Sequence, residues 1–229
     1  MNDFMQREIV ITEDGSHTFF VPGMNEHFHS THGAIQESNH VFIQNGLLKC
    51  NKQELVVMET GFGTGLNVLL TLMNLGERNI RYFSIEKYPL TDNEYNRLNY
   101  PALVSEGFHD LFLSIHQCEW NKEAEIVPGF RLTKLPADLT GFSFNGLPRF
   151  DLIYFDAFAP GKQPEMWQES IFSKIAEHTL PRGVFVTYCA QGEVRRTLTR
   201  VGFKMQRIPG PPGKKEMLLG EKTDSCHSI

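Results

Sequence analysis

Three alternate glycines, Gly61, Gly63 and Gly65, lie between two apolar runs, residues 55–58 and 68–73. The first run predicts a buried strand and the second predicts a helix. Alternate glycines allow a tight turn and leave no Cβ between the backbone and a ligand. The N–H groups at the start of the helix have no partner within it, so they attract a polar or anionic group. We therefore expect a ligand to bind at this turn.

The spacing of the glycines and a preceding acid narrow the choice of ligand. The spacing is G-x-G-x-G, whereas dinucleotide-binding proteins have G-x-G-x-x-G. Glu59 lies two residues before the first glycine. Its carboxylate would repel a pyrophosphate and would suit a ligand that carries an ammonium group. S-adenosylmethionine has that group and no phosphate, so we expect it here; the alternative is a glycine-rich turn without a ligand.

Three further carboxylates end or follow predicted strands. Glu86 ends its strand, where α/β nucleoside-binding proteins hold ribose hydroxyls. Asp138 either contacts an adenine amino group or caps the next turn. Asp156 follows a strand expected beside residues 55–58, at the point where such sheets bind ligands, and its alternative role is to cap that turn.

The elements that position these residues alternate between strand and helix. This order predicts an α/β, Rossmann-like fold of class I with a mostly parallel seven-stranded sheet that ends in an antiparallel hairpin. The predicted strands are residues 55–58, 80–86, 130–135, 150–155, 183–188, 202–208 and 216–220, and the polar residues 120–129 are expected to form a loop.

A small β extension is expected before this domain. Two β-rich runs, residues 8–12 and 17–21, flank Asp14-Gly15, which is a hairpin signal. A helix is expected from Gly33. We divide the chain into an extension (1–45), the Rossmann-like domain (46–222) and a disordered tail (223–229).

Composition fits a soluble α/β domain. The chain has 229 residues, 41% of them hydrophobic, and it contains no apolar run of the about 18 residues that a membrane helix needs. The N-terminus lacks the apolar stretch of a signal peptide. The four cysteines form no C-x-x-C pair, so we expect a reduced, cytoplasmic protein without structural zinc or disulfides.

Charge is distributed unevenly along the chain. The net charge is −5, yet residues 181–220 contain eight basic and two acidic residues, a local charge of +6. Such a region can bind phosphates, and Arg195, Lys214 and Lys215 are candidate contacts. The alternative is a set of solvated helix and hairpin faces.

The segment 26–43 contains a H-x-H-x-x-H pattern, His27, His29 and His32. No cysteine or carboxylate pattern completes a zinc signature, so we expect no metal and favour a polar pocket lining. Glu37, on the helix that follows, either reaches the ligand or faces solvent.

Three groups of residues resemble one family. They are residues 59–67, the pair of segments 156–160 and 164–167, and residues 214–218; Ser30, Gly33 and Glu37 also fit. Together they resemble the methyltransferase domain of MnmC, a bifunctional tRNA-modification enzyme of bacteria. The resemblance covers nearly all of residues 8–220. We expect a stand-alone (MnmD-type) version, because the chain has no room for the FAD-dependent half.

The resemblance implies an activity and a set of contacts. The activity is methylation of 5-aminomethyl-2-thiouridine at the tRNA wobble position with S-adenosyl-L-methionine, and another enzyme would supply the amine. Asp156 would orient the amine or accept its proton, and the anticodon stem-loop would be the docking region. The implied substrate contacts are Phe158, Pro160, Lys162, Arg195, Lys214 and Lys215. The implied cofactor contacts are Glu37, Glu59, Thr60, Gly61, Phe62, Gly63, Thr64, Gly65, Asn67, Glu86, Lys87 and Asp138.

Other functions remain open at this stage. A methyltransferase of small amines or phenols would share the cofactor site and would not need the basic region. A non-catalytic RNA-binding relative would not need the acidic set. An NAD-dependent dehydrogenase is disfavoured by the glycine spacing.

Overall fold

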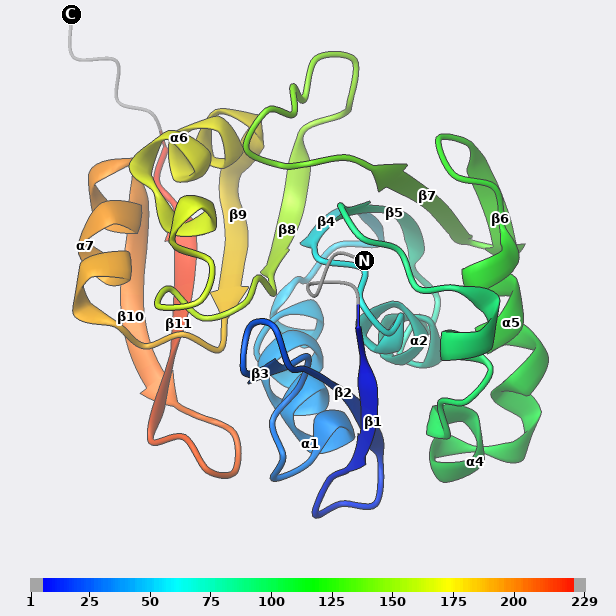
Figure 1. The fold of residues 1–229 in the computed structure, drawn as a ribbon. Coiled ribbons are helices and arrows are strands. Elements are labelled where there is room, and N and C mark those ends of the chain that lie inside the picture. The colour runs from blue at the N-terminus through cyan, green and yellow to red at the C-terminus, as the bar shows by residue number, and fades with distance from the viewer. Residues whose placement is uncertain (1–5, 225–229) are drawn as a thin grey trace, which may run out of the picture.

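The computed structural model describes residues 6–224. Its centre is an eight-stranded sheet in the order β10-β11-β9-β8-β4-β5-β7-β6 (Figure 1). The five central strands pair in parallel, and both edges are antiparallel. The strands are β4 (Glu54–Thr60), β5 (Asn79–Glu86), β6 (Glu123–Val127), β7 (Phe130–Pro136), β8 (Phe150–Phe155), β9 (Thr179–Thr187), β10 (Phe203–Pro209) and β11 (Glu216–Lys222).

The predicted fold class is confirmed, including the C-terminal antiparallel hairpin, and β8 lies beside β4 as expected. The strand count of seven and the loop at residues 120–129 were wrong. Residues Glu123–Val127 form an eighth strand that pairs antiparallel with β7. An edge strand needs no apolar run, because one side of it faces solvent. Gly129, with φ of +84°, makes the tight turn into β7.

The N-terminal extension has three strands, one more than the expected hairpin. They are β1 (Glu8–Ile11), β2 (His17–Val21) and β3 (Glu26–His27). The expected helix begins at Ala34 as α1 (Ala34–Ser38) and continues as a wider π-helical segment, Asn39–Gln44. Figure 1 shows these blue elements grouped together beside the lower end of β8. The last five residues of the expected tail lie outside the described residues.

Helices cover both faces of the sheet, and the sheet separates the core into two clusters. One cluster lies under α2 (Leu66–Met73) and α5 (His109–Gln117), and the other under α6 (Glu169–His178) and α7 (Gly192–Arg200). The remaining helices are α3 (Asp92–Tyr95) and α4 (Tyr100–Val104), with short 3₁₀ turns at Leu47–Lys49, Glu106–Phe108 and Pro164–Trp167.

Trp167 belongs to the second cluster. Its ring packs against Phe155 at 5.0 Å between ring centroids, and its Nε1 donates to the Phe158 carbonyl at 2.7 Å. Trp167 is therefore a core residue. The bond also anchors the loop that follows β8 to the core.

Among residues 6–224, no helix is both long and apolar enough to cross a bilayer. Cys50, Cys118 and Cys189 are free thiols. Cys226 lies outside the described residues.

Candidate active site

The glycine turn joins β4 to α2 by a compact path that only glycine can follow. Gly61, Gly63 and Gly65 all have left-handed backbone angles, with φ of +85°, +49° and +72°. A Cβ on Gly61 would lie 3.0 Å from the Asp156 carbonyl oxygen, and one on Gly65 would lie 2.8 Å from His116 Nε2. Only glycine meets both demands, since it tolerates positive φ and needs no room for a side chain.

Two buried basic residues, His116 and Lys134, support this turn from behind, and no sequence pattern predicted either of them. His116 Nε2 lies 3.1 Å from the Thr64 carbonyl oxygen, and Lys134 Nζ donates to the His116 carbonyl at 2.5 Å. Burial lowers the pKa of His116 to about 3. The ring is therefore neutral, and its N–H donates to Thr64.

A cavity of about 740 Å³ opens in front of the turn, at the carboxyl ends of β4, β5, β7 and β8. This size and position are typical of a ligand site in a doubly wound sheet. The cavity walls include fourteen of the residues expected in the site: Glu37, Thr60, Gly61, Phe62, Gly63, Thr64, Asn67, Glu86, Lys87, Asp138, Asp156, Phe158, Lys162 and Lys214. The walls do not include Glu59, Gly65, Pro160, Arg195 or Lys215.

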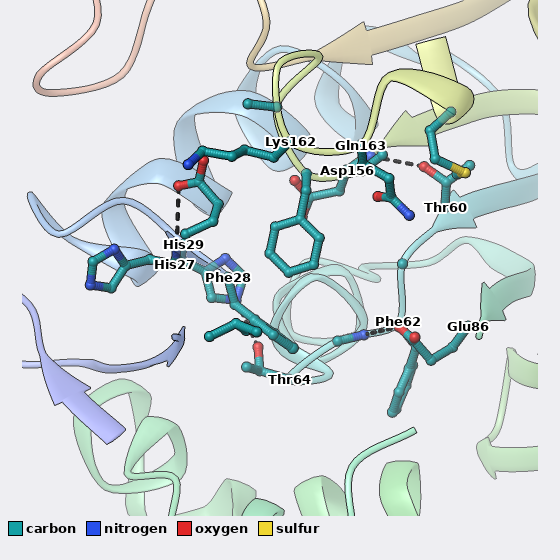
Figure 2. A pocket seen from close by; sticks show the side chains of 18 of the residues that line it. His27, Phe28, His29, Thr60, Phe62, Thr64, Glu86, Asp156, Lys162 and Gln163 are labelled. Atoms are coloured by element: carbon teal, nitrogen blue, oxygen red, sulfur yellow. Dashed lines mark hydrogen bonds between the residues drawn. The ribbon is translucent and has the colours of Figure 1, made fainter. Parts of the chain in front are cut away.

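Glu86 ends β5 and Asp156 directly follows β8, the two strands that flank β4. Figure 2 shows both residues among those that line the cavity. Glu86 Oε2 accepts the Gly63 backbone N–H at 3.0 Å, and its Oε1 accepts that of Tyr88 at 2.7 Å. The carboxylate is thus tied to the glycine turn and half-buried at the cavity wall. A hydroxyl-bearing ligand at the turn would meet it.

Asp138 caps the next turn, one of the two roles considered from sequence, and it also lines the cavity. Its Oδ1 accepts the Thr140 backbone N–H and hydroxyl at 2.9 and 2.7 Å, which caps the turn after β7. Its Oδ2 lies 2.8 Å from Lys87 Nζ at the cavity wall. The bond to Lys87, followed by that to Thr140, lowers the pKa of Asp138 to about 2. The carboxylate stays ionised at any physiological pH.

Asp156 has the environment of a proton acceptor. Its backbone N–H donates to Thr60 Oγ1 at 3.0 Å, and its Oδ2 accepts Asn67 Nδ2 at 2.9 Å. Burial raises the pKa of this carboxyl to about 7, and the charge of Glu37 raises it further, while Asn67 and Lys214 oppose the shift. A carboxyl that titrates near neutrality can both accept and release a proton.

Glu37 and Lys214 meet at the cavity. Lys214 Nζ lies 2.5 Å from Glu37 Oε1 and 4.0 Å from the centre of the Tyr188 ring. Glu37 Oε2 also accepts the Ser30 backbone N–H at 2.8 Å. The helix residue Glu37 therefore faces the site and not solvent.

The N-terminal extension forms a roof over the cavity. Lys162 Nζ donates to the carbonyls of Met24 and Asn25, both at 3.0 Å, and the rings of Phe28 and Phe158 pack edge-on at 5.4 Å between centroids. These contacts join the turn between β2 and β3 to the loop after β8. Sequence patterns gave no indication of this roof, because its contacts join segments more than 100 residues apart.

The three histidines of the H-x-H-x-x-H pattern make separate contacts. His29 Nε2 lies 2.7 Å from Thr64 Oγ1, His27 packs on Phe20, and His32 Nδ1 lies 3.0 Å from Glu13. Within residues 6–224, no group of three or more potential ligands could hold a metal ion. Burial lowers the pKa of His29 to about 4, so its ring is neutral and supports the glycine turn.

The residues present fit S-adenosyl-L-methionine. The glycine turn lines the cavity at Gly61 and Gly63 with backbone and no side chain, the ends of β5 and β7 carry carboxylates at the wall, and Phe62, Ile85 and Leu139 supply apolar wall surface. Glu59 does not lie where the sequence led us to expect it, facing the ammonium group of the ligand. It is fully buried behind the turn, so an ammonium group in the cavity would not reach its carboxyl.

Comparisons with known proteins indicate the class of enzyme. A family model described as S-adenosyl-L-methionine-dependent methyltransferase matches residues 136–223. The chain is 32% identical to the "tRNA 5-methylaminomethyl-2-thiouridine biosynthesis bifunctional protein MnmC" of Pseudomonas paraeruginosa, over 96% of the chain and 36% of that protein. The identity to the protein of the same name from Cupriavidus metallidurans is also 32%, over 93% of the chain and 33% of that protein.

A solved structure is also similar over nearly the whole fold. It is that of MnmC2 from Aquifex aeolicus, with a TM-score of 0.81 and 25% identity, covering 96% of this chain and 71% of that chain. The chain spans about a third of the length of the curated relatives it matches. The fold, the cavity at the glycine turn and these matches together identify the chain as an S-adenosyl-L-methionine-dependent methyltransferase similar to the methyltransferase part of the MnmC proteins.

Proposed function

We propose that this enzyme transfers a methyl group to the primary amine of 5-aminomethyl-2-thiouridine at the wobble position of tRNA, giving 5-methylaminomethyl-2-thiouridine. The observation that carries the proposal is the position of Asp156. Its carboxyl lies at the cavity wall beside the glycine turn, held by Asn67 at 2.9 Å, with its pKa raised to about 7. The names of the relatives support the choice of substrate.

The chemistry requires a neutral amine and an acceptor for one proton. S-adenosyl-L-methionine, when bound, supplies an electrophilic methyl group on its sulfonium. The lone pair of the substrate nitrogen would form the new N–C bond while the S–CH₃ bond breaks, with its electron pair left on sulfur in S-adenosyl-L-homocysteine. The nitrogen then loses a proton. Asp156 orients the amine through its free carboxylate oxygen and accepts that proton. Enclosure of the site by the roof limits the access of water.

The other cavity residues would position the cofactor and the amine relative to each other. The glycine turn and Asn67 would contact the methionine part, Glu86 the ribose, and Asp138 with Lys87 the adenine. Phe158 and Lys162 line the entry to the cavity on the roof side. Pro160, Arg195 and Lys215, which lie outside the cavity, would contact the anticodon stem-loop around the flipped nucleotide. A separate enzyme would supply the aminomethyl group.

The charges of residues 181–220 support a local contact with tRNA and do not indicate a strong nonspecific affinity for RNA. Five of its eight basic residues are paired with carboxylates, namely Arg182, Arg196, Arg200, Arg207 and Lys214. Arg195 and Lys215 are exposed. A few phosphate contacts near the cavity fit a protein whose net charge is −5.

The test uses tRNA isolated from cells that accumulate 5-aminomethyl-2-thiouridine. The enzyme and methyl-labelled S-adenosyl-L-methionine are added, and digested nucleosides are analysed by mass spectrometry. We expect label in 5-methylaminomethyl-2-thiouridine, and none after digestion of a tRNA that lacks the aminomethyl group. Label in small amines or phenols without label in this tRNA would overturn the proposal.

A further inference from the structure

A buried arginine from the N-terminal segment lies at the cavity wall. Arg7 directly precedes β1, and its side chain is only 3% exposed. A buried charge costs free energy unless charged and polar partners surround it. The partners of Arg7 therefore indicate what the residue does.

The Arg7 guanidinium joins three separate segments of the chain. Its Nη1 donates to both carboxylate oxygens of Glu94 in α3, at 3.0 and 3.1 Å, and its Nη2 donates to the backbone carbonyl of Tyr88 at 2.6 Å. Its Cζ lies 5.7 Å from the centre of the Phe28 ring, which belongs to the roof. The planar fork of a guanidinium suits several acceptors at once.

Glu94 is a fixed anchor for this arginine. Its Oε2 accepts the backbone N–H of Thr91 at 2.7 Å and the Thr91 hydroxyl at 2.8 Å, so it belongs to the capping box of α3. A carboxylate held in this way cannot follow a moving partner without loss of the cap. Arg7 is therefore held by Glu94, and the Tyr88 carbonyl is the group that it holds in turn.

The segment after β5 depends on backbone contacts for its position. Residues 87–91 form neither helix nor strand, and the Tyr88 side chain is 40% exposed. The Tyr88 carbonyl accepts from Arg7, and its N–H donates to Glu86 Oε1 at 2.7 Å. The other oxygen of Glu86 accepts the Gly63 N–H at 3.0 Å. A chain of hydrogen bonds thus leads from Arg7 through Tyr88 to Glu86 and the glycine turn.

We propose that Arg7 is a positioning residue for the nucleoside part of S-adenosyl-L-methionine, and that its guanidinium fork acts through the Tyr88 backbone on Glu86. Without it, the segment after β5 would have to become ordered as the cofactor binds, which costs affinity. Lys87, whose Nζ pairs with Asp138, belongs to the same segment. The proposal rests on the ribose contact proposed above for Glu86 and does not depend on the methyl acceptor.

The test measures two ligands by calorimetry, S-adenosyl-L-homocysteine and its analogue without the 2′-hydroxyl. The wild type should bind the first about tenfold more tightly, the scale of one hydrogen bond to a charged group. Arg7→Met should weaken S-adenosyl-L-homocysteine about tenfold and the analogue less than about threefold, because the lost contact is the one to the hydroxyl. The ratio is taken on one variant, so partly unfolded protein would lower both affinities alike.

Two further variants separate the fork from its charge. Arg97→Met removes the same charge from an exposed position just after α3, outside the cavity, and should bind both ligands as the wild type does. Arg7→Lys keeps the charge but replaces the fork by a single nitrogen, so it should bind S-adenosyl-L-homocysteine at least about threefold more weakly than the wild type. Wild-type affinity in Arg7→Lys would show that charge alone suffices and would overturn the proposal.

Kinetics distinguish positioning of the cofactor from a part in the chemistry. Arg7→Met should raise the KM for S-adenosyl-L-methionine and keep kcat within about twofold at saturation, since Asp156 is untouched. A kcat lowered tenfold or more at saturating cofactor would place Arg7 in the methyl-transfer step and contradict the proposal.

Glu86→Gln, measured with the same two ligands, tests the ribose contact by itself. If it loses the discrimination between the ligands while Arg7→Met keeps it, the ribose contact stands and the role of Arg7 is wrong. If Glu86→Gln keeps the discrimination, the ribose contact is wrong and the role of Arg7 with it. The calorimetry needs no acceptor, so its result holds even if the proposed tRNA substrate is wrong.

Discussion

Lys214 Nζ lies 2.5 Å from Glu37 Oε1, so the loop between β10 and β11 is tied to α1 across 177 residues of sequence. The sequence led us to expect that Lys214 meets RNA and that Glu37 meets the cofactor. In the structure the two residues meet each other at the cavity wall, against the Tyr188 ring. The ion pair lines one side of the cavity, and its two charges shift the pKa of Asp156 in opposite directions.

Loss of this ion pair should destabilise the fold. Lys214→Met leaves the Glu37 carboxylate, whose side chain is 8% exposed, without its cation. We expect a loss of about 1–3 kcal/mol in the free energy of unfolding, measured in urea, because a buried charge left without its partner is costly. Lys215→Met, at the exposed neighbouring position, should change it by less than about 0.5 kcal/mol. Adding Glu37→Gln to Lys214→Met should recover most of the loss; no recovery would mean that the pair itself is not the cause.

Asp156→Asn should separate cofactor binding from chemistry. Asparagine keeps the shape of the side chain but cannot accept the amine proton. We expect the rate to fall about 10²- to 10⁴-fold, while calorimetry shows cofactor affinity within a few-fold of wild type. Asp138→Asn, in the same cavity, should instead weaken cofactor binding and leave kcat nearly unchanged. Full activity of Asp156→Asn would remove this residue from the mechanism.

The decline of kcat at low pH should follow the protonation of Asp156. Its folded pKa is about 7, so protonation below this pH removes the proton acceptor and kcat should decline. Lys214 lowers this pKa, and Lys214→Met should therefore move the acid limb of kcat to higher pH. An acid limb that does not move would show that the Lys214 charge is not felt at Asp156.

Exposed basic residues outside the cavity should affect RNA and not the cofactor. Arg195→Glu and Lys215→Glu should each raise the KM for tRNA several-fold and reduce the dependence of binding on salt by about one unit of slope. Lys122→Glu, which precedes the opposite edge strand β6, is the matched control. If all three variants behave alike, the effect is one of net charge and the basic region is only a solvated surface.

The roof contact at Lys162 should control entry to the site. Lys162→Met removes the two bonds to the carbonyls of Met24 and Asn25. We expect faster amide hydrogen exchange at residues 22–28 and a higher KM for tRNA, with the Tm changed by only a few degrees. Unchanged exchange in this segment would mean that the aromatic contact between Phe28 and Phe158 holds the roof without Lys162.

The sequence alone determined the features that depend on local pattern. Buried parallel strands are continuous apolar runs, so β8 was predicted at its observed bounds, residues 150–155, and the glycine turn was recognisable because few other sequences can make it. The positions of Glu86 and Asp156 at strand ends followed from the same rule, since the carboxyl ends of parallel strands share one edge. Local pattern missed β6, whose edge position requires no apolar signal.

Only the tertiary structure decided which of these side chains meet. The pairing of Glu37 with Lys214 and the roof over the cavity join segments that no local pattern connects. The direction of Glu59 was decided in the same way. A residue at the end of a strand can face the ligand or the core. Glu59 is fully buried, its carboxyl accepts the Ser84 hydroxyl, and it does not line the cavity.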